Sequence, residues 1–182
     1  MELLKFVVLF MSAVCVCEGA ALPACNLTSF MIQDKNKRCN KLLQNMGGRM
    51  PQECLNEKII SFPKDVFIKA QNEDMLMVAL ETLKGVNKIF KNEQTSVTWE
   101  KNDLSLFTNI VHRQVKSLRD CVGEEAETDK PADGSAATLR SYFETLEKRL
   151  KEREFSLCSW EMVRTELQDG LKKFQTFLES KK

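Results

Sequence analysis

Histidine is nearly absent from this chain, and so are the residue patterns of familiar catalytic sites. The 182 residues include one histidine, His112, so a histidine base or a histidine-rich metal site is difficult to build. The sequence contains no GxxxxGK(S/T) phosphate loop, no HExxH zinc motif and no GxSxG nucleophile elbow. No pattern pairs a nucleophile with its base. The sequence therefore predicts a protein that is not an enzyme and uses no metal or cofactor.

An excess of charge of one sign is also lacking. Lys and Arg total 27 against 26 Asp and Glu, a formal net charge of +1 at pH 7. Nucleic-acid-binding domains carry a strongly basic face, so we predict no nucleic-acid partner. Basic residues gather from Lys148 to Arg153, but glutamates are interleaved with them. That pattern is typical of a salt-bridged, solvent-exposed helix face; the alternative is a weak contact with a polyanion.

No apolar run is long enough to predict a membrane-spanning helix. The run from Phe6 to Val16 has about half of the roughly 20 residues that a spanning helix needs. A short basic start precedes it and small residues follow, as in a secretory signal peptide; a buried N-terminal helix is the alternative. We predict that residues 1–21 are removed, with Gly19 and Ala24 as alternative cleavage points. Residues 22–182 then form one secreted, extracellular domain without membrane insertion.

Five of the seven cysteines follow the predicted signal peptide, and in an oxidising compartment most should pair. Two bridges and one free thiol can be arranged in several ways, so counting does not choose between them. Cys39 shares a helical face with Leu42, Leu43 and Met46, which indicates a buried, inert thiol. A zinc site is disfavoured because there is no CxxC pair and no nearby histidine. The remaining cysteines lie near expected helix ends or in loops, where a bridge is a useful tether: Cys25, Cys54, Cys121 and Cys158.

Hydrophobic periodicity predicts an all-α fold, because no alternating strand pattern is sustained. We expect five helices, over about 28–46, 73–91, 99–122, 135–153 and 157–179. Gly47 and Gly48 suit the end of the first helix. The last two helices carry the clearest apolar stripes. These stripes consist of Leu139, Tyr142, Phe143, Leu146 and Leu150, followed by Trp160, Val163, Leu167, Leu171, Phe174 and Leu178.

A long connection, residues 48–72, separates the first two helices. Connections of this length are usually functional or disordered. Apolar side chains indicate that this one packs: Phe62, Val66, Phe67 and Ile68. Asn72, Thr98 and Ser135 are the expected caps or first residues of the next helices. Bundles with such a connection can place neighbouring helices in parallel.

The stretch from Leu139 to Leu167, LRSYFETLEKRLKEREFSLCSWEMVRTEL, resembles type I interferons. The shared features are a Tyr-Phe pair at 142–143, a Leu-Lys-Glu turn at 150–152 and a Cys-x-Trp-Glu-x-Val-Arg helix start at 158–164. Further upstream, MGG at 46–48 and SFP at 61–63 look like the first-helix end and first loop of the teleost (fish) branch. The resemblance covers essentially the whole predicted mature chain.

This resemblance implies a fold and a function. The fold is a five-helix, long-chain helical cytokine bundle with a long first crossover loop. The function is that of a secreted, monomeric antiviral cytokine that bridges a heterodimeric class II cytokine receptor, so that Janus kinases phosphorylate STAT factors. One alternative is another long-chain helical cytokine or growth factor acting through a different receptor. A secreted helical lipid carrier is a more distant one.

The resemblance also implies cysteine pairs and receptor contacts. Four-cysteine members of the family pair first with third and second with fourth, here Cys25–Cys121 and Cys54–Cys158. The second pair ties the long connection to the last helix, so that both form one surface for the higher-affinity receptor chain. We expect Arg164 to lie on the outer face of that helix and Trp160 in the core. The positions that match family receptor contacts are Leu55, Lys58, Arg164, Thr165 and Gln168.

Two further expectations concern the surface of the secreted domain. Asn26-Leu27-Thr28 is an N-glycosylation sequon, which has meaning in a secreted chain. The second receptor chain is expected to meet the second and third helices.

Overall fold

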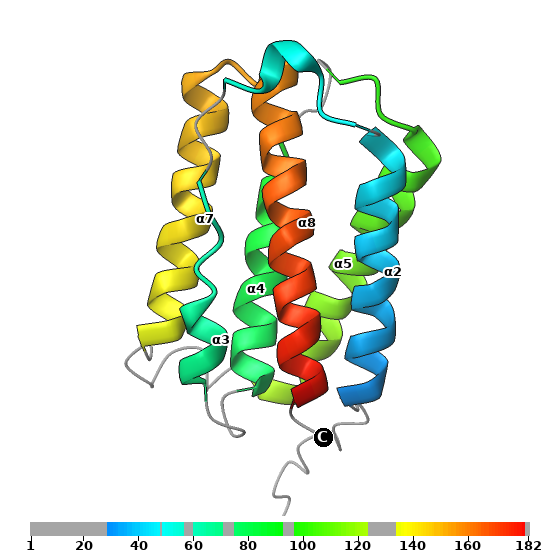
Figure 1. The fold of residues 1–182 in the computed structure, drawn as a ribbon. Coiled ribbons are helices and arrows are strands. Elements are labelled where there is room, and N and C mark those ends of the chain that lie inside the picture. Colours follow the sequence, from blue (N-terminus) through cyan, green and yellow to red (C-terminus); the bar gives the residue numbers. More distant parts are fainter. Residues whose placement is uncertain are drawn as a thin grey trace, which may run out of the picture.

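The computed structural model describes residues 29–47, 49–56, 60–70, 75–92, 97–123 and 134–180. These residues form a helical bundle (Figure 1). Its elements are α2 (Ser29–Gly47), the 3-10 helix η1 (Gln52–Cys54), α3 (Asp65–Lys69), α4 (Met75–Ile89), α5 (Lys101–Val122), α7 (Gly134–Glu152) and α8 (Leu157–Ser180). The predicted all-α class is confirmed, and the five long helices begin and end within two residues of the expected bounds. Within the described ranges, no helix has the length and apolarity that crossing a membrane requires.

The long crossover sets the topology of the bundle. Figure 1 shows α2 rising to η1, after which the chain returns along the bundle to α3, so that α4 runs in the same direction as α2. Helix α8 lies between α7 and α2 in this view. It contacts α2 most extensively, and α4 packs between α5 and α7. The first and last long helices are therefore neighbours.

The predicted apolar stripes of the last two long helices lie in the core. All eleven of their members are at most 7% exposed. Trp160 is completely buried, and its ring lies 5.8 Å from that of Trp99. Cys39 is also buried, as predicted, and is a free thiol. A lipid carrier needs an apolar cavity, whereas aromatic rings pack against one another in the described core.

The crossover packs against the bundle, as its apolar residues predicted. The Phe67 ring stacks on those of Phe174 and Phe177 at 5.6 and 5.3 Å. The hydroxyl of Ser135 donates to the carbonyl of Val66 at 3.4 Å. Ile68 was expected to pack as well, and this was wrong: it is 77% exposed. It lies on the short helix α3, whose other face carries Val66 and Phe67 into the core.

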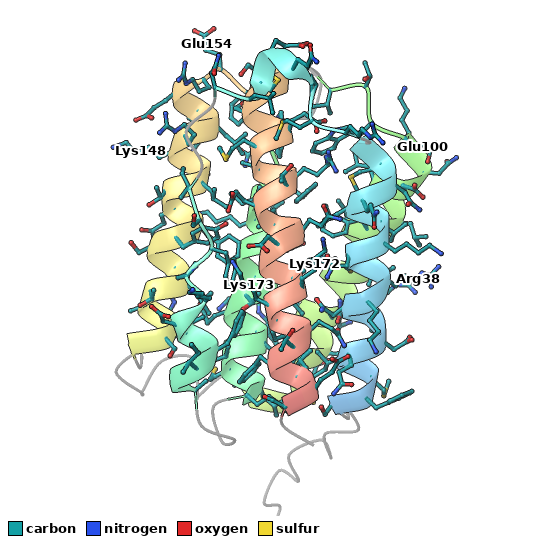
Figure 2. All side chains as sticks on the ribbon, viewed as in Figure 1. Arg38, Glu100, Lys148, Glu154, Lys172 and Lys173 are labelled. Carbon is teal, nitrogen blue, oxygen red and sulfur yellow. A yellow bond between two sulfur atoms is a disulfide. The ribbon has the colours of Figure 1, made fainter. Side chains whose placement is uncertain are left out.

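Two of the expected helix starts differ in detail. Thr98 was expected to cap the third long helix, but α5 begins at Lys101 and its cap is Glu100 (Figure 2). The Glu100 carboxylate accepts a hydrogen bond from the Asp103 backbone N–H at 2.8 Å, which satisfies one of the unpaired amides of the first turn. Helix α7 begins at Gly134 rather than Ser135. The expected cap at Asn72 lies outside the described residues, as do residues 1–28.

Candidate recognition surface

A disulfide joins the crossover to the start of the last helix. Cys54 in η1 and Cys158 in the first turn of α8 have sulfur atoms 2.00 Å apart and are separated by 104 residues in the sequence. A bridge that closes a loop of this size stabilises the fold by about 4–5 kcal/mol in the chain-entropy model. This is the second of the two pairs that the family resemblance implies. Cys121 is also disulfide-bonded, but Cys25 lies outside the described residues.

Beneath this bridge lies a buried ion pair that the sequence did not predict. Arg164 was expected on the outer face of the last helix, and this was wrong: its side chain is 3% exposed. Its Nε and Nη2 atoms donate to Glu161 Oε2 at 3.0 and 2.8 Å. Its Nη1 donates to the backbone carbonyl of Leu43 at 2.8 Å. The position faces α2, whose final turns cover it, so Arg164 joins the first and last helices.

The contact between Arg164 and the end of α2 depends on the glycine at that helix end, Gly47. A Cβ atom at Gly47 would lie 2.2 Å from Arg164 Nε and 2.7 Å from its Cδ. Without a side chain at Gly47, the guanidinium reaches the carboxyl end of α2, where the helix dipole favours a positive charge. The glycine that the sequence assigned to a helix end therefore also makes room for the arginine.

Trp99 extends this network to the start of α5. Its indole N–H donates to Glu161 Oε1, so both carboxylate oxygens of Glu161 have partners. The backbone N–H of Glu100 donates to the Met46 carbonyl at 3.0 Å. Three segments, namely the end of α2, the start of α5 and the start of α8, are thus bonded at one end of the bundle. Sequence reasoning missed Glu161, although the i, i+3 spacing of Glu161 and Arg164 was a usable signal.

The other predicted receptor-contact residues that the structure describes lie on η1 and α8, near the Cys54–Cys158 disulfide. In Figure 1, η1 crosses the end of the bundle above the start of α8, and the two elements are in contact. Leu55, which follows η1, is 67% exposed. On α8, Thr165 is exposed and Gln168 is half-buried. Lys58 lies outside the described residues. We define Leu55, Thr165 and Gln168 as the η1–α8 surface.

A second set of contacts holds the crossover along α8. The Phe62 backbone N–H bonds the carboxylate of Glu166, which is 8% exposed. A Cβ atom at Gly170 would lie 2.3 Å from the Phe62 ring, so this ring lies directly against the α8 backbone. Burial raises the pKa of Glu166, and the nearby charge of Asp169 raises it further. The Glu166 carboxyl group, which is buried next to the η1–α8 surface, is therefore protonated more readily than an exposed glutamate.

Nothing in the described residues resembles a catalytic or metal centre. No group of three or more His, Cys, Asp or Glu side chains is arranged there to hold a metal ion. His112 is exposed on α5. The arrangement is suited to recognition, because it fixes an exposed leucine and polar helix residues on one stiff scaffold.

Comparison with known proteins gives a consistent result. Residues 29–181 match the interferon alpha/beta domain. Interferon alpha-17 of Homo sapiens is 30% identical over 142 residues, which cover 75% of each chain. Interferon a3 of Oncorhynchus mykiss is 31% identical over 136 residues, which cover 72% of each chain. Zebrafish interferon 2 superposes with a TM-score of 0.69 at 28% identity, over 79% of this chain and 96% of that chain.

Proposed function

Because this chain belongs to the type I interferon family, we propose that it acts by bridging the two chains of a class II cytokine receptor. It is a type I interferon-like cytokine with antiviral signalling. The family implies a secreted protein and a type I interferon receptor. In the proposed mechanism, the two receptor chains bring their Janus kinases together, and these kinases phosphorylate STAT factors.

The η1–α8 surface is the proposed site for the higher-affinity receptor chain. The observation that carries this assignment is the Cys54–Cys158 disulfide, which fixes η1 against the first turn of α8. A surface held in its binding conformation loses little conformational entropy when the receptor binds. Leu55 supplies an exposed apolar anchor, and Thr165 and Gln168 supply polar contacts around it. Lys58, by its match to the family's contact positions, is a further proposed receptor contact.

Arg164 has a different proposed role from the one that the family resemblance implies. Its guanidinium is committed to Glu161 and to the Leu43 carbonyl, and 3% of its side chain is exposed. This burial supports a positioning role: Arg164 keeps the end of α2 against α8, and receptor affinity depends on it indirectly.

The proposal also covers the maturation of the chain: signal-peptide removal, disulfide formation and glycosylation. Residues 1–21 form the signal peptide, Cys25 pairs with Cys121, and Asn26 is glycosylated in the secreted protein. The disulfide-bonded state of Cys121 supports the pairing. The chain is assigned to the four-cysteine teleost branch, and its similarity to the Oncorhynchus mykiss and zebrafish interferons supports that assignment. Peptide mass mapping of the secreted protein tests cleavage, pairing and glycosylation together; a peptide linking Cys25 to a cysteine other than Cys121 contradicts the branch assignment.

The surface is tested with the variant Leu55→Ala/Gln168→Ala. We expect its affinity for the receptor ectodomain to fall about tenfold or more, as for other interface anchors, with a parallel loss of antiviral gene induction. Helical circular dichroism should be unchanged, because both side chains reach solvent. Ile68→Ala is the matched control, since it removes an exposed aliphatic side chain from the same crossover. Equal receptor affinity in the double variant and the wild type contradicts the proposed surface.

A further inference from the structure

Phe30, the second residue of α2, is a large apolar side chain that the described part of the chain leaves uncovered. It is 75% exposed. Three other members of the same helix face are exposed and charged, at intervals of four, seven and eleven residues: Asp34, Lys37 and Lys41. Single exposed apolar residues are common on protein surfaces. The exposure of Phe30 therefore points to a contact only if the molecule supplies a group that covers the ring.

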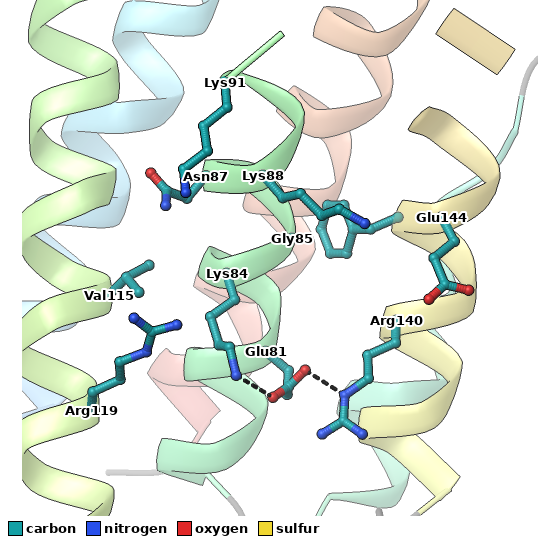
Figure 3. A pocket seen from close by; sticks show the side chains of 11 residues that line it. Glu81, Lys84, Gly85, Asn87, Lys88, Lys91, Val115, Arg119, Arg140 and Glu144 are labelled. Carbon is teal, nitrogen blue, oxygen red and sulfur yellow. Dashed lines mark hydrogen bonds and ion pairs between the residues drawn. The ribbon is translucent and has the colours of Figure 1, made fainter. Parts of the chain in front are cut away.

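This face of α2 lies apart from both expected receptor surfaces. Lys37, two helical turns after Phe30, forms an ion pair with Glu179 near the end of α8 at 3.1 Å. The start of α2 therefore lies beside the end of α8, at the end of the bundle opposite η1 (Figure 1). The second receptor chain is expected on α4 and α5. The groove that these helices form with α7 is lined by residues of those three helices and by Lys91, directly after α4 (Figure 3). Neither surface includes Phe30.

The N-glycosylation sequon, residues 26–28, ends directly before the first residue of α2. Asn26 and Phe30 are four residues apart, so the covalent chain keeps their Cα atoms within about 14 Å of each other. The proposed Cys25–Cys121 bridge attaches the residue before Asn26 to the last turn of α5, so the chain is restrained on both sides of the sequon. A sugar joined to the Asn26 side chain is thus confined to the neighbourhood of the Phe30 ring.

A pyranose sugar and a phenyl ring have complementary faces. One face of N-acetylglucosamine presents C–H groups, whose hydrogens carry partial positive charge, and the face of an aromatic ring is negative. Packing one face on the other also removes apolar surface of both from water. We propose that the first N-acetylglucosamine of a glycan on Asn26 packs on the Phe30 ring and shields it from solvent. This inference rests on the proposed glycosylation of Asn26 and adds the residue against which the glycan is ordered.

The test is a double-variant cycle on the full secreted chain, expressed in cells that glycosylate it. Phe30→Ala leaves the sequon intact, and Asn26→Gln removes the glycan. We expect Phe30→Ala to lower the melting temperature of the glycosylated protein by about 2–4 °C and to leave that of the Asn26→Gln protein nearly unchanged. Ile68→Ala is the matched control, because Ile68 is exposed to a similar degree on α3; its effect should be the same with and without the glycan. If Asn26→Gln is not secreted, enzymatic removal of the glycan from the folded protein takes its place.

Two further measurements identify the sugar in contact. Trimming the glycan to its first N-acetylglucosamine with an endoglycosidase should leave the difference between the two backgrounds intact, because that sugar makes the contact. In NMR spectra, the ring current of the phenyl group should shift the proton signals of this sugar upfield, and Phe30→Ala should abolish the shift. Phe30→Trp keeps an aromatic face and should retain an upfield shift, whereas Phe30→Leu keeps apolar surface alone and should lose it.

Three outcomes overturn the proposal. The first is an equal change in melting temperature on Phe30→Ala with and without the glycan. The second is a loss of receptor affinity or of self-association in glycosylated Phe30→Ala, which assigns the ring to a protein contact. The third is an unmodified Asn26 in the mass spectrum of the secreted protein, which removes the occupant. Receptor binding is measured separately with Leu55→Ala/Gln168→Ala, so the failure of the receptor proposal and the failure of this one are distinguishable.

Discussion

Arg164 on α8 donates a hydrogen bond of 2.8 Å from Nη1 to the backbone carbonyl of Leu43 on α2. These residues are 121 positions apart in the sequence. The same guanidinium forms a two-pronged ion pair with Glu161, so one side chain links a carboxylate on its own helix to the backbone of another. Glu161 in turn binds the Trp99 indole N–H. The stability of this end of the bundle therefore depends on the buried hydrogen bonds that join Arg164, Glu161 and Trp99.

Arg164→Ala should lower the free energy of unfolding by about 3–5 kcal/mol, because it leaves the Glu161 carboxylate buried without its cation. Urea unfolding followed by circular dichroism measures this change. Arg164→Lys should lose less, since it keeps the charge but not the two-pronged geometry. Thr165→Ala, on the neighbouring exposed position, is the control. An unfolding midpoint of Arg164→Ala equal to that of the control shows that the ion pair is not needed for stability.

Gly170→Ala should destabilise the crossover. The added Cβ would lie 2.3 Å from the Phe62 ring, and that ring is confined by Phe67 and Tyr142 at 5.4 and 5.0 Å. Overpacking of this kind costs about 1–3 kcal/mol. Gly134→Ala is the matched control, because nothing lies within 4 Å of its added Cβ. The double variant Gly170→Ala/Phe62→Leu should recover part of the loss, and thermal unfolding compares all three. Equal melting temperatures for the two glycine variants contradict close packing at Gly170.

Glu166→Gln should stabilise the protein at pH 7. Burial first, and then the charge of Asp169, raise the pKa of Glu166 in the folded state, so the folded protein holds this proton more tightly than the unfolded chain. The favourable contribution of the protonated form is complete below the unfolded pKa of about 4.3. It is lost as pH rises through the folded pKa. The glutamine side chain is neutral at every pH and still accepts the Phe62 N–H.

Denaturant unfolding at pH 7 and at pH 4 tests this prediction. The advantage of Glu166→Gln over the wild type should shrink as the pH falls. Glu53→Gln changes an exposed glutamate and should show no such pH dependence. A stability difference that is constant between the two pH values contradicts the proposed proton linkage.

The thiol of Cys39 should resist alkylation in the folded protein. It is 0% exposed, and burial raises its pKa to about 12, against a smaller opposing effect of Arg38. Since the thiolate is the reactive form, iodoacetamide should label Cys39 only after denaturation without reductant. Mass spectrometry of both states measures the labelling. Rapid labelling of the folded protein contradicts the buried position.

The helices were predictable because their signals are local. The stripe from Leu139 to Leu150 and the one from Trp160 to Leu178 repeat at helical spacing, and all their members are buried. The position of Arg164 depends instead on the end of α2, more than a hundred residues earlier in the chain. Helical periodicity places Arg164 on its own helix but contains no information about which neighbour covers it. Its burial therefore required the tertiary structure.

The capping residue of α5 could not be predicted from the sequence either, because it too depends on a contact with another helix. Thr98 is a good capping residue by type, yet the Glu100 side chain takes that role. The Glu100 backbone N–H is bonded to Met46, and this contact with α2 fixes where the chain turns into α5. The prediction that Ile68 packs against the bundle was wrong for a related reason. Apolar character alone does not tell which face of a five-residue helix meets the core.

The antiparallel pairing of α2 with α8 has a practical consequence for handling the molecule. Gln33 near the start of α2 donates to the Leu178 carbonyl near the end of α8 at 2.8 Å, so the start of α2 and the end of α8 lie together at the end of the bundle opposite η1 (Figure 1). A tag, fluorophore or solid support attached beyond Ser180 therefore joins the described bundle at the end of α8, a full helix length from η1 and Leu55. Such a fusion leaves that leucine facing outward for any partner presented to it.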